Sequence, residues 1–247
     1  TLFPYTTLFR SGKGKEYDYE GKLIFKGEYL KGEKDGKAKE YYMNGNLRFE
    51  GEYINGNKWN GKSYDPANNN ISELKEGKGF VKYYNIEGTL QFEGELLNGQ
   101  KTGKGKEYNK FSNKLEFEGE YLNGKKNGKF KEYHVDGKLI FEGEYINGMK
   151  NGKGKVYYLN GNLRFEGEYL KGDKLNGKGY NQTNSLIYEL KEGKGYIMEY
   201  YCKGSLLFEG EYKNGKRNGK GKDYNIFEGK IEYEGEYKNG KRKTYNM

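Results

Sequence analysis

FEGEYINGMKNGKGKVYYLNGNLR, residues 141–164, is the stretch that decides the fold of this chain. Strict alternation places Phe141, Gly143 and Tyr145 on one face of a strand and two glutamates on the other, a period of two that is typical of a half-buried β-strand. An Asn-Gly pair then supplies a turn, because both residues tolerate positive φ. The segment KGKVYY alternates again on the way back. Residues 141–164 therefore predict one β-hairpin and the turn into the next.

The same phrase recurs along the chain. The glycines of FEGEY and its variants stand at 27, 51, 94, 119, 143, 167, 210 and 235, with spacings of 24, 43, 25, 24, 24, 43 and 25. Each step of 43 contains a shortened copy, the first beginning at Ile71 and the second at Ile187. The series itself repeats after 116 residues, so residues 12–127 and 128–243 are predicted to be two blocks of five hairpins each.

Glycine recurs in the middle of nearly every predicted strand, where it normally weakens a strand. We interpret these glycines as room for an aromatic ring that lies across bare backbone from a neighbouring strand. A lone hairpin of this kind buries too little surface, so neighbouring hairpins must share their faces. The predicted fold class is all-β: an elongated, solenoid-like array of about ten antiparallel β-hairpins with no helices of note, forming one continuous sheet and one repeat domain, residues 12–247.

The composition supports this prediction. Only 33% of the 247 residues are apolar, aromatic residues supply much of that share, and the 40 glycines make long helices improbable. No apolar run approaches the ~18 residues needed to span a membrane. The single cysteine excludes an intramolecular disulfide framework and a cysteine-based zinc site. A reducing compartment fits these features, and we expect a cytoplasmic protein, with a location peripheral to a membrane or to the cytoskeleton as the alternative.

The formal net charge is +9, but only 5 of the 45 basic residues are arginine. Arginine is the residue that forks onto guanine edges and phosphates, so its scarcity argues against nucleic acid as a partner. The lysine excess permits anionic partners without selecting one.

The first eleven residues, TLFPYTTLFRS, match no repeat. They resemble the translation of a short-read sequencing adapter, and they lack the charged and apolar segments of a signal peptide. We expect residues 1–11 to be an artefactual leader on a gene that is truncated upstream, where further domains are missing, and residues 244–247 to be a tail.

The phrase FEGEYKNGKRNGKGKDY, residues 208–224, carries the pattern YxGxxxNGxxxGxGxxY and resembles the MORN (membrane occupation and recognition nexus) repeat. The linking phrase NGNLRFEGEY resembles the bacterial MORN variant of antitoxin-like proteins. The chain departs from the family where Tyr29, Tyr53 and Tyr145 replace the common Trp or Phe. The resemblance implies hairpin arrays that act as scaffolds, dimerisation elements or membrane tethers, sometimes attached to lipid kinases or methyltransferases. It implies no activity for the repeats themselves.

Three features invite a catalytic or ligand-binding hypothesis and lead to none. GNKWNGKS, residues 56–63, fits the phosphate-loop pattern, but YDPANNN follows in place of the helix that this motif needs. His134 is the only histidine and occupies the position of Tyr158 in the next copy. Cys202 occupies the position of Leu159, a turn residue. We therefore expect no enzyme activity, no catalytic, cofactor-binding or metal-binding residues, and no cofactor.

Basic residues recur after the predicted turns and form a candidate contact row for anionic lipid or a partner: Lys125, Lys126, Lys150, Lys216, Arg217, Lys241 and Arg242. The predicted function is a non-catalytic scaffold for protein–protein interaction or assembly, with a homodimer among the expected forms. One alternative is a peripheral tether to anionic phospholipid through these residues. The other is an accessory or targeting segment of an enzyme, such as a lipid kinase or methyltransferase, whose catalytic domain lies upstream.

Overall fold

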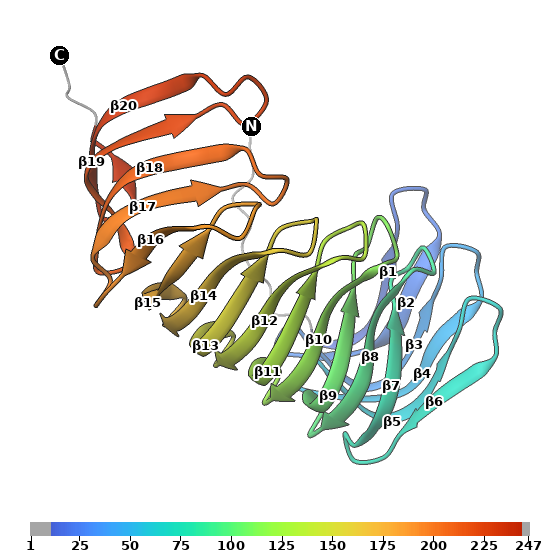
Figure 1. Cartoon of the computed structure of the whole chain (residues 1–247). Helices are drawn as coiled ribbons and strands as arrows, with labels where there is room; N and C mark the ends of the chain where they lie inside the picture. Colours follow the sequence, from blue (N-terminus) through green and yellow to red (C-terminus); the bar gives the residue numbers. More distant parts are fainter. Residues whose placement is uncertain (1–10, 244–247) are drawn as a thin grey trace. The chain divides into compact units, whose positions relative to one another are not determined.

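The computed structural model describes residues 11–243 and is all-β, as the sequence predicts (Figure 1). The predicted leader (residues 1–11) lies outside the described residues apart from Ser11, and so does the predicted tail. The described strands are β1 (Gly12–Tyr17), β2 (Leu23–Leu30), β3 (Glu33–Tyr41), β4 (Leu47–Ile54), β5 (Asn57–Tyr64), β6 (Asn70–Leu74), β7 (Gly79–Tyr84), β8 (Leu90–Leu97), β9 (Gln100–Tyr108), β10 (Leu115–Leu122), β11 (Lys125–Tyr133), β12 (Leu139–Ile146), β13 (Met149–Tyr157), β14 (Leu163–Leu170), β15 (Asp173–Tyr180), β16 (Leu186–Leu190), β17 (Gly195–Tyr200), β18 (Leu206–Lys213), β19 (Lys216–Tyr224), β20 (Ile231–Lys238) and β21 (Lys241–Arg242).

The prediction of one continuous sheet is wrong. The described strands form three antiparallel sheets, β1 to β6, β7 to β16 and β17 to β21, each in sequence order. Both breaks fall inside the shortened hairpins: a single bridge, Lys75↔Lys78, joins the β6 side to the β7 side, and Lys191↔Lys194 does the same for β16 and β17. Leu74 at the end of β6 and Val81 in β7 are buried in the two strands that separate.

The chain divides into two compact units. Unit 1 comprises residues 1–115 with 121–125, and unit 2 comprises residues 116–120 with 126–247. Each unit repeats the same local packing. Among residues 11–243 we found no helix with the length and hydrophobicity that a membrane crossing requires.

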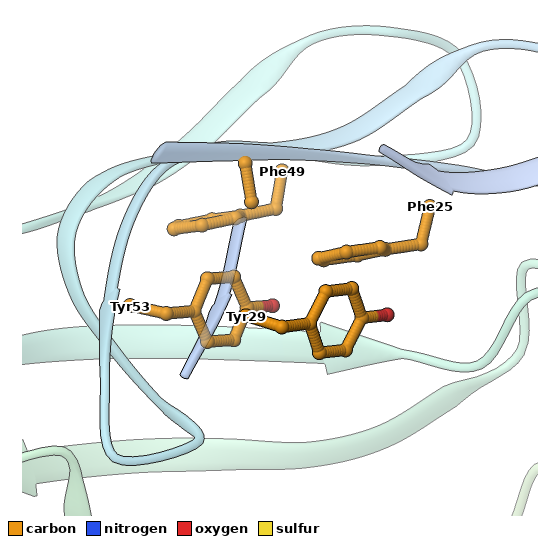
Figure 2. Close-up of a cluster of buried hydrophobic side chains, with 5 residues drawn as sticks. Phe25, Tyr29, Phe49 and Tyr53 are labelled. Atoms are coloured by element: carbon orange, nitrogen blue, oxygen red, sulfur yellow. The ribbon is translucent and has the colours of Figure 1, made fainter. Parts of the chain in front are cut away.

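Aromatic rings lying on glycines form the core of unit 1. Phe25, Tyr29, Phe49 and Tyr53 are buried together (Figure 2). A Cβ added to Gly27 would stand 2.7 Å from the tip of Phe25. The Phe25 and Tyr29 rings meet edge to face at 5.4 Å, as do Phe49 and Tyr53 at 5.5 Å. The interpretation of the glycines as room for rings is confirmed, with the addition that Phe25 covers a glycine of its own strand.

Unit 2 contains the hairpin that opened the sequence analysis, β12 and β13. A Cβ on Gly143 would stand 2.6 Å from the Phe141 ring and 2.8 Å from the Cα of Gly154 on the facing strand. A Cβ on Gly154 would stand 3.1 Å from the Tyr169 ring, which comes from the neighbouring strand β14. Glycine facing glycine thus lets the rings lie flat on the backbone of both strands.

The predicted Asn-Gly turns have positive φ at both central residues, for example 51° at Asn147 and 84° at Gly148, as type I′ turns require. Lys31 and Glu76 also adopt positive φ in turns of this kind. The segment that resembles a phosphate loop, residues 56–63, begins in such a turn and continues as β5, so no helix follows it.

Candidate functional site

The type I′ turns of each unit lie side by side. The N–H of each turn glycine donates to a carbonyl of the preceding hairpin: Gly56 to Lys34 at 2.9 Å in unit 1, and Gly148 to Lys126 at 2.8 Å in unit 2. Successive turns are therefore two strands, or about 10 Å, apart. The turns form one hydrogen-bonded edge in each unit, which we call the turn row.

An apolar side chain stands exposed just before each full-length turn over most of the turn row. These residues, which we call the apolar stripe, are 41% to 51% exposed: Leu30, Ile54, Leu97 and Leu122 in unit 1, and Ile146 and Leu170 in unit 2. Lysine takes over at the last two turns, as Lys213 and Lys238. The stripe was not among the sequence-based predictions, although an apolar residue before the turn in copy after copy was the signal.

The structure separates the predicted turn cations into two groups. Lys125, Lys216 and Lys241 occupy the first strand position after their turns and are exposed. Lys216 pairs with Asp173 at 3.3 Å. These side chains belong to the turn row and are available to a partner or to a charged surface.

The other predicted cations occupy the next position, where alternation turns them toward the core rings. Lys150 Nζ lies 3.6 Å from the centre of the Phe141 ring and pairs with Glu132 at 3.2 Å. The same stacking recurs for Lys126 on Phe117 (2.9 Å), Arg217 on Phe208 (4.1 Å) and Arg242 on Tyr233 (4.8 Å). It also recurs for residues that we did not predict: Lys34 on Phe25 (3.7 Å), Lys58 on Phe49 (4.3 Å), Lys101 on Phe92 (4.4 Å) and Lys174 on Phe165 (4.7 Å).

Cation–π contacts of this kind stabilise by about 0.5–2 kcal/mol each, depending on desolvation. The stacked residues therefore serve the core, whereas the exposed ones remain candidates for contact. A basic residue two positions after each full-length turn glycine was the sequence signal for this row.

Tyrosine hydroxyls donate to acids of the preceding strand, a second feature that the sequence analysis missed. In the inner series, one oxygen of the acid accepts the hydrogen bond: Tyr29 with Glu16 (2.5 Å), Tyr53 with Glu40 (2.6 Å), Tyr145 with Glu132, Tyr212 with Glu199, and Tyr237 with Asp223 (2.6 Å). An outer series repeats the arrangement nearer the surface: Tyr64 with Glu50, Tyr108 with Glu93, Tyr133 with Glu118, Tyr157 with Glu142, Tyr180 with Glu166, and Tyr224 with Glu209.

The densest polar cluster of unit 1 surrounds Glu40. Lys58 Nζ lies 2.7 Å from its Oε2, Arg48 Nη2 lies 3.3 Å from the same oxygen, and Lys34 Nζ lies 3.7 Å from Oε1. Tyr53 donates to Oε1. Burial alone would raise the pKa of Glu40, but Lys58 and Arg48 outweigh it and lower that pKa to about 2. The cluster therefore holds a buried carboxylate ionised at neutral pH.

Unit 1 also carries a groove of about 1200 Å³ over β1 to β5. Its lining is formed by residues that alternate with the core rings, together with bare glycine backbone. The charged lining residues are Lys13, Lys15, Lys26, Lys37, Lys39, Glu28, Glu50 and Glu52. Lysines outnumber glutamates among these charged residues.

The remaining candidates have structural surroundings. His134 Nδ1 lies 3.1 Å from the Asp136 carboxylate, next to its own turn. Cys202 is a free thiol in a turn, and its carbonyl accepts from the N–H of Leu159 at 2.9 Å. Within residues 11–243, no three His, Cys, Asp or Glu side chains gather as a metal site would require.

Comparison with known families and structures gives two results. The MORN repeat variant matches residues 34–55 and 126–147, and the MORN repeat matches residues 92–109, 141–163, 208–222 and 233–243. Every matched segment lies on the hairpins described above. No curated protein matches the chain.

Among solved structures, the chain is similar to TcdB2-TccC3 without its hypervariable C-terminal region, at 11% identity over 85% of this chain and a TM-score of 0.23. It is also similar to TcdB2-TccC3-TEV, at 13% identity over 87% of this chain and a TM-score of 0.21. The chain spans 14% and 12% of the length of these two chains. The family matches, together with the hairpins on which they fall, show that this chain carries MORN repeats in both the standard and the variant form.

Proposed function

We propose that the chain is a non-catalytic MORN-repeat scaffold that docks a protein partner on its turn row. The observation that carries this proposal is the apolar stripe, in which leucine or isoleucine stands half exposed before most of the full-length turns. Single exposed apolar residues are ordinary, but here they stand in pairs at neighbouring turns about 10 Å apart. The pairs are Leu30 with Ile54 and Leu97 with Leu122 in unit 1, and Ile146 with Leu170 in unit 2.

Two exposed aromatic residues and the groove of unit 1 are further surfaces that a partner could contact. Phe111 and Phe227 stand at equivalent loop tips of the two blocks and are 86% and 90% exposed. Exposed aromatic residues at such positions are favourable anchors for a partner. The groove over β1 to β5 of unit 1 is a separate surface, lined by lysines, glutamates and glycine backbone.

The test compares substitutions on the apolar stripe with substitutions on an exposed face away from it. One variant replaces Leu97, Leu122, Ile146 and Leu170 of the apolar stripe by glutamine, and the control replaces exposed Lys153 and Lys155 on the opposite face of β13 by glutamine. Proteins cross-linked in the source cells should be retained by the wild type and the control and lost by the stripe variant, and light scattering should show whether a homodimer is lost with them. Equal retention by all three proteins would refute docking on the turn row.

A second candidate function is tethering to anionic phospholipid. The exposed residues Lys125, Lys216 and Lys241 favour it, because each basic residue near an anionic surface contributes about 1 kcal/mol. Vesicles containing phosphatidylserine should sediment the wild type at low salt and release the variant in which these three lysines are glutamine. No sedimentation of the wild type at low salt would exclude this function.

The third alternative, an accessory segment of an enzyme, stays a prediction. It concerns residues outside this sequence, and the native gene read outward from the repeat region tests it directly. A catalytic domain in that reading frame would make the hairpins its targeting or assembly arm.

A further inference from the structure

In the Glu40 cluster of unit 1, three cations and a tyrosine hydroxyl converge on one carboxylate. A cavity of about 380 Å³ adjoins this carboxylate and is lined by the same groups. The three cations and the tyrosine form an anion-binding site, here called the receptor, and the Glu40 side chain is the anion that fills it.

The same receptor is built again 116 residues later, in unit 2. The equivalents of the surrounding residues are identical in type: Lys150, Arg164, Tyr169 and Lys174. The strand register is also the same, because position 156 faces Phe165 as Glu40 faces Phe49. The cations of unit 2 are therefore held by the same backbone framework.

Local contacts confirm the equivalence. Arg164 Nη1 donates to the carbonyl of Tyr200 at 2.8 Å, as Arg48 Nη1 donates to that of Tyr84 at 3.2 Å. The Tyr158 hydroxyl reaches the carbonyl of residue 180, as the Tyr42 hydroxyl reaches that of residue 64. These bonds fix the arginine at the sheet break in both units.

The carboxylate is missing from the second receptor. Val156 occupies the position of Glu40 and is buried. An isopropyl group ends at Cγ, one carbon before the place where a glutamate carboxylate begins. The position that Glu40 fills with two oxygens is therefore left without an acceptor from residue 156.

Two cations lose their partner as a result. Arg164 and Lys174 make no ion pair within 4.0 Å anywhere in residues 11–243, whereas Lys150 keeps Glu132 at 3.2 Å. Burial lowers the pKa of Lys174 to about 8; Glu199 opposes this shift and Arg164 adds to it. An anion bound beside this buried amine would stabilise its charged form.

Glu199 stands at the position of Tyr83 in unit 1 and attracts Lys174 electrostatically, but both of its oxygens are bonded to other groups. Its oxygens accept from the Tyr212 hydroxyl and from Arg217 Nη2 at 2.5 Å. Arg217 also binds Asp223 at 2.7 Å. The charge of Glu199 therefore raises the pKa of Lys174, but the two side chains form no ion pair.

We infer that Lys150, Arg164, Tyr169 and Lys174 form an anion-binding subsite in unit 2 that takes a carboxylate in the position of the Glu40 side chain. Arg164 and Lys174 supply charge, and the Tyr169 hydroxyl donates as Tyr53 does to Glu40. The ligand is a small carboxylate, free or at the end of an acidic side chain of a partner. This inference does not depend on the proposed scaffold function.

The test uses the full chain with sodium acetate as the probe, against sodium chloride at equal ionic strength. At an acetate concentration about ten times the dissociation constant, binding should raise the Tm by roughly 3 °C. Isotope-labelled lysine followed by NMR should show the Lys174 signal titrating at higher pH in acetate than in chloride. An N-acetylated glutamate amide should act like acetate if an acidic side chain fits.

Two substitutions at position 156 distinguish the effect of a negative charge in the site from the effect of filling its space. Val156→Glu should abolish the response to acetate and move the Lys174 titration toward the ordinary range of lysine. Val156→Gln fills the same space without charge, so it should abolish the response but leave the Lys174 titration low. Glu40→Val should create a second acetate response in unit 1; if that variant does not fold, the two variants at position 156 decide alone.

Three results would overturn the inference. The first is an acetate response that survives in Val156→Glu, and the second is no response of the wild type to acetate. The third is a response to inorganic phosphate with none to acetate, which would assign the cations to a phosphate group and refute the carboxylate.

Discussion

The full hairpin of β12 and β13 and the shortened hairpin of β16 and β17 begin from the same kind of turn, since residues 147–148 and 192–193 all adopt positive φ. From there they differ. β12 and β13 stay paired along most of their length, whereas β16 and β17 share only the bridge next to their turn.

The side chains in the middle of the strands explain the difference. In the full hairpin, Gly143 faces Gly154, and the Phe141 ring lies flat on both. In the shortened hairpin, Leu190 and Ile197 are buried at the corresponding places. Branched side chains need depth between the strands, so pairing stops there. Sheet continuity in this chain therefore depends on glycine in the strands as well as on hydrogen bonds.

Alkaline pH should give the largest effect, because it acts on the tyrosines of all the full hairpins together. Burial, together with Glu40, Glu132 or Asp223, raises the pKa of Tyr53, Tyr145 and Tyr237 above 10.0, to about 12 for Tyr237. Unfolded tyrosine ionises near pH 10, so this stability is fully present below about pH 10 and is lost as the pH rises through the folded pKa values. Circular dichroism and tyrosinate absorbance should change together.

Complete ionisation of tyrosine while the β-sheet signal is intact would show that the hydroxyls of the full hairpins are not held by their acids.

Glu40→Ala should be the most damaging single substitution among those considered. It leaves Lys58, Arg48 and Lys34 around an empty position, and removal of one partner of a buried pair costs about 3–5 kcal/mol. The matched control is Val156→Ala, which should cost only about 2 kcal/mol from lost burial. Denaturant unfolding measures both; equal losses would mean that the two clusters are energetically alike.

Lowering the pH gives a second test of the Glu40 cluster. The pKa of Glu40 lies at about 2 in the folded chain and at 4.5 ordinarily. Its contribution, about 3 kcal/mol at full strength, is present above pH 4.5 and disappears as the pH falls to about 2. The stability difference between the wild type and Glu40→Ala should therefore shrink over this window. A difference independent of pH would contradict the assigned ionisation.

Gly143→Ala tests the packing of rings on glycine. The new Cβ would meet the Phe141 ring at 2.6 Å and the backbone of β13 at 2.8 Å, so we expect a loss of about 1–3 kcal/mol. Lys153→Ala, on the exposed face of the facing strand, should change stability by less than about 0.5 kcal/mol. If Gly143→Ala is as mild as the control, flat packing is not what keeps the full hairpins paired.

The smallest effect is expected at a turn of a shortened hairpin. Glu76 has a φ of 51°, which costs a side chain other than asparagine about 1 kcal/mol. Glu76→Asn should therefore stabilise unit 1 by up to about 1 kcal/mol, and Asn147→Glu should destabilise unit 2 by a similar amount. Thermal unfolding checks the pair, and a loss of stability in Glu76→Asn would mean that the glutamate has a role of its own.

Much of the fold is predictable from the sequence, because the repeat restates it in each copy. Alternation gives the strands, Asn-Gly gives the turns, and glycine beside aromatic residues gives the ring packing, as the hairpin around Gly143 shows. The sheet breaks were not predicted. The shortened copies were visible, but the separation of β6 from β7 depends on how Leu74 and Val81 pack.

The candidate contact row was predicted as one set and is divided by the structure. Lys216 and Arg217 are neighbours in sequence, yet one is exposed and the other stacks on Phe208. Alternation predicts such a division once the core face is known. The partnership of Glu40 with Tyr53 was harder to foresee, because the two are 13 residues apart and join across strands.

The hydrogen bonds of the turn row also have a mechanical consequence. Each turn glycine is bonded to the preceding hairpin, as Gly172 is to Lys150 at 2.8 Å. A pulling force on the two chain ends would peel hairpins off one at a time, because each has its own turn bond and its own pair of strands to release. Each full repeat would free about 24 residues, or roughly 80 Å of chain, so the force–extension curve would be a regular sawtooth.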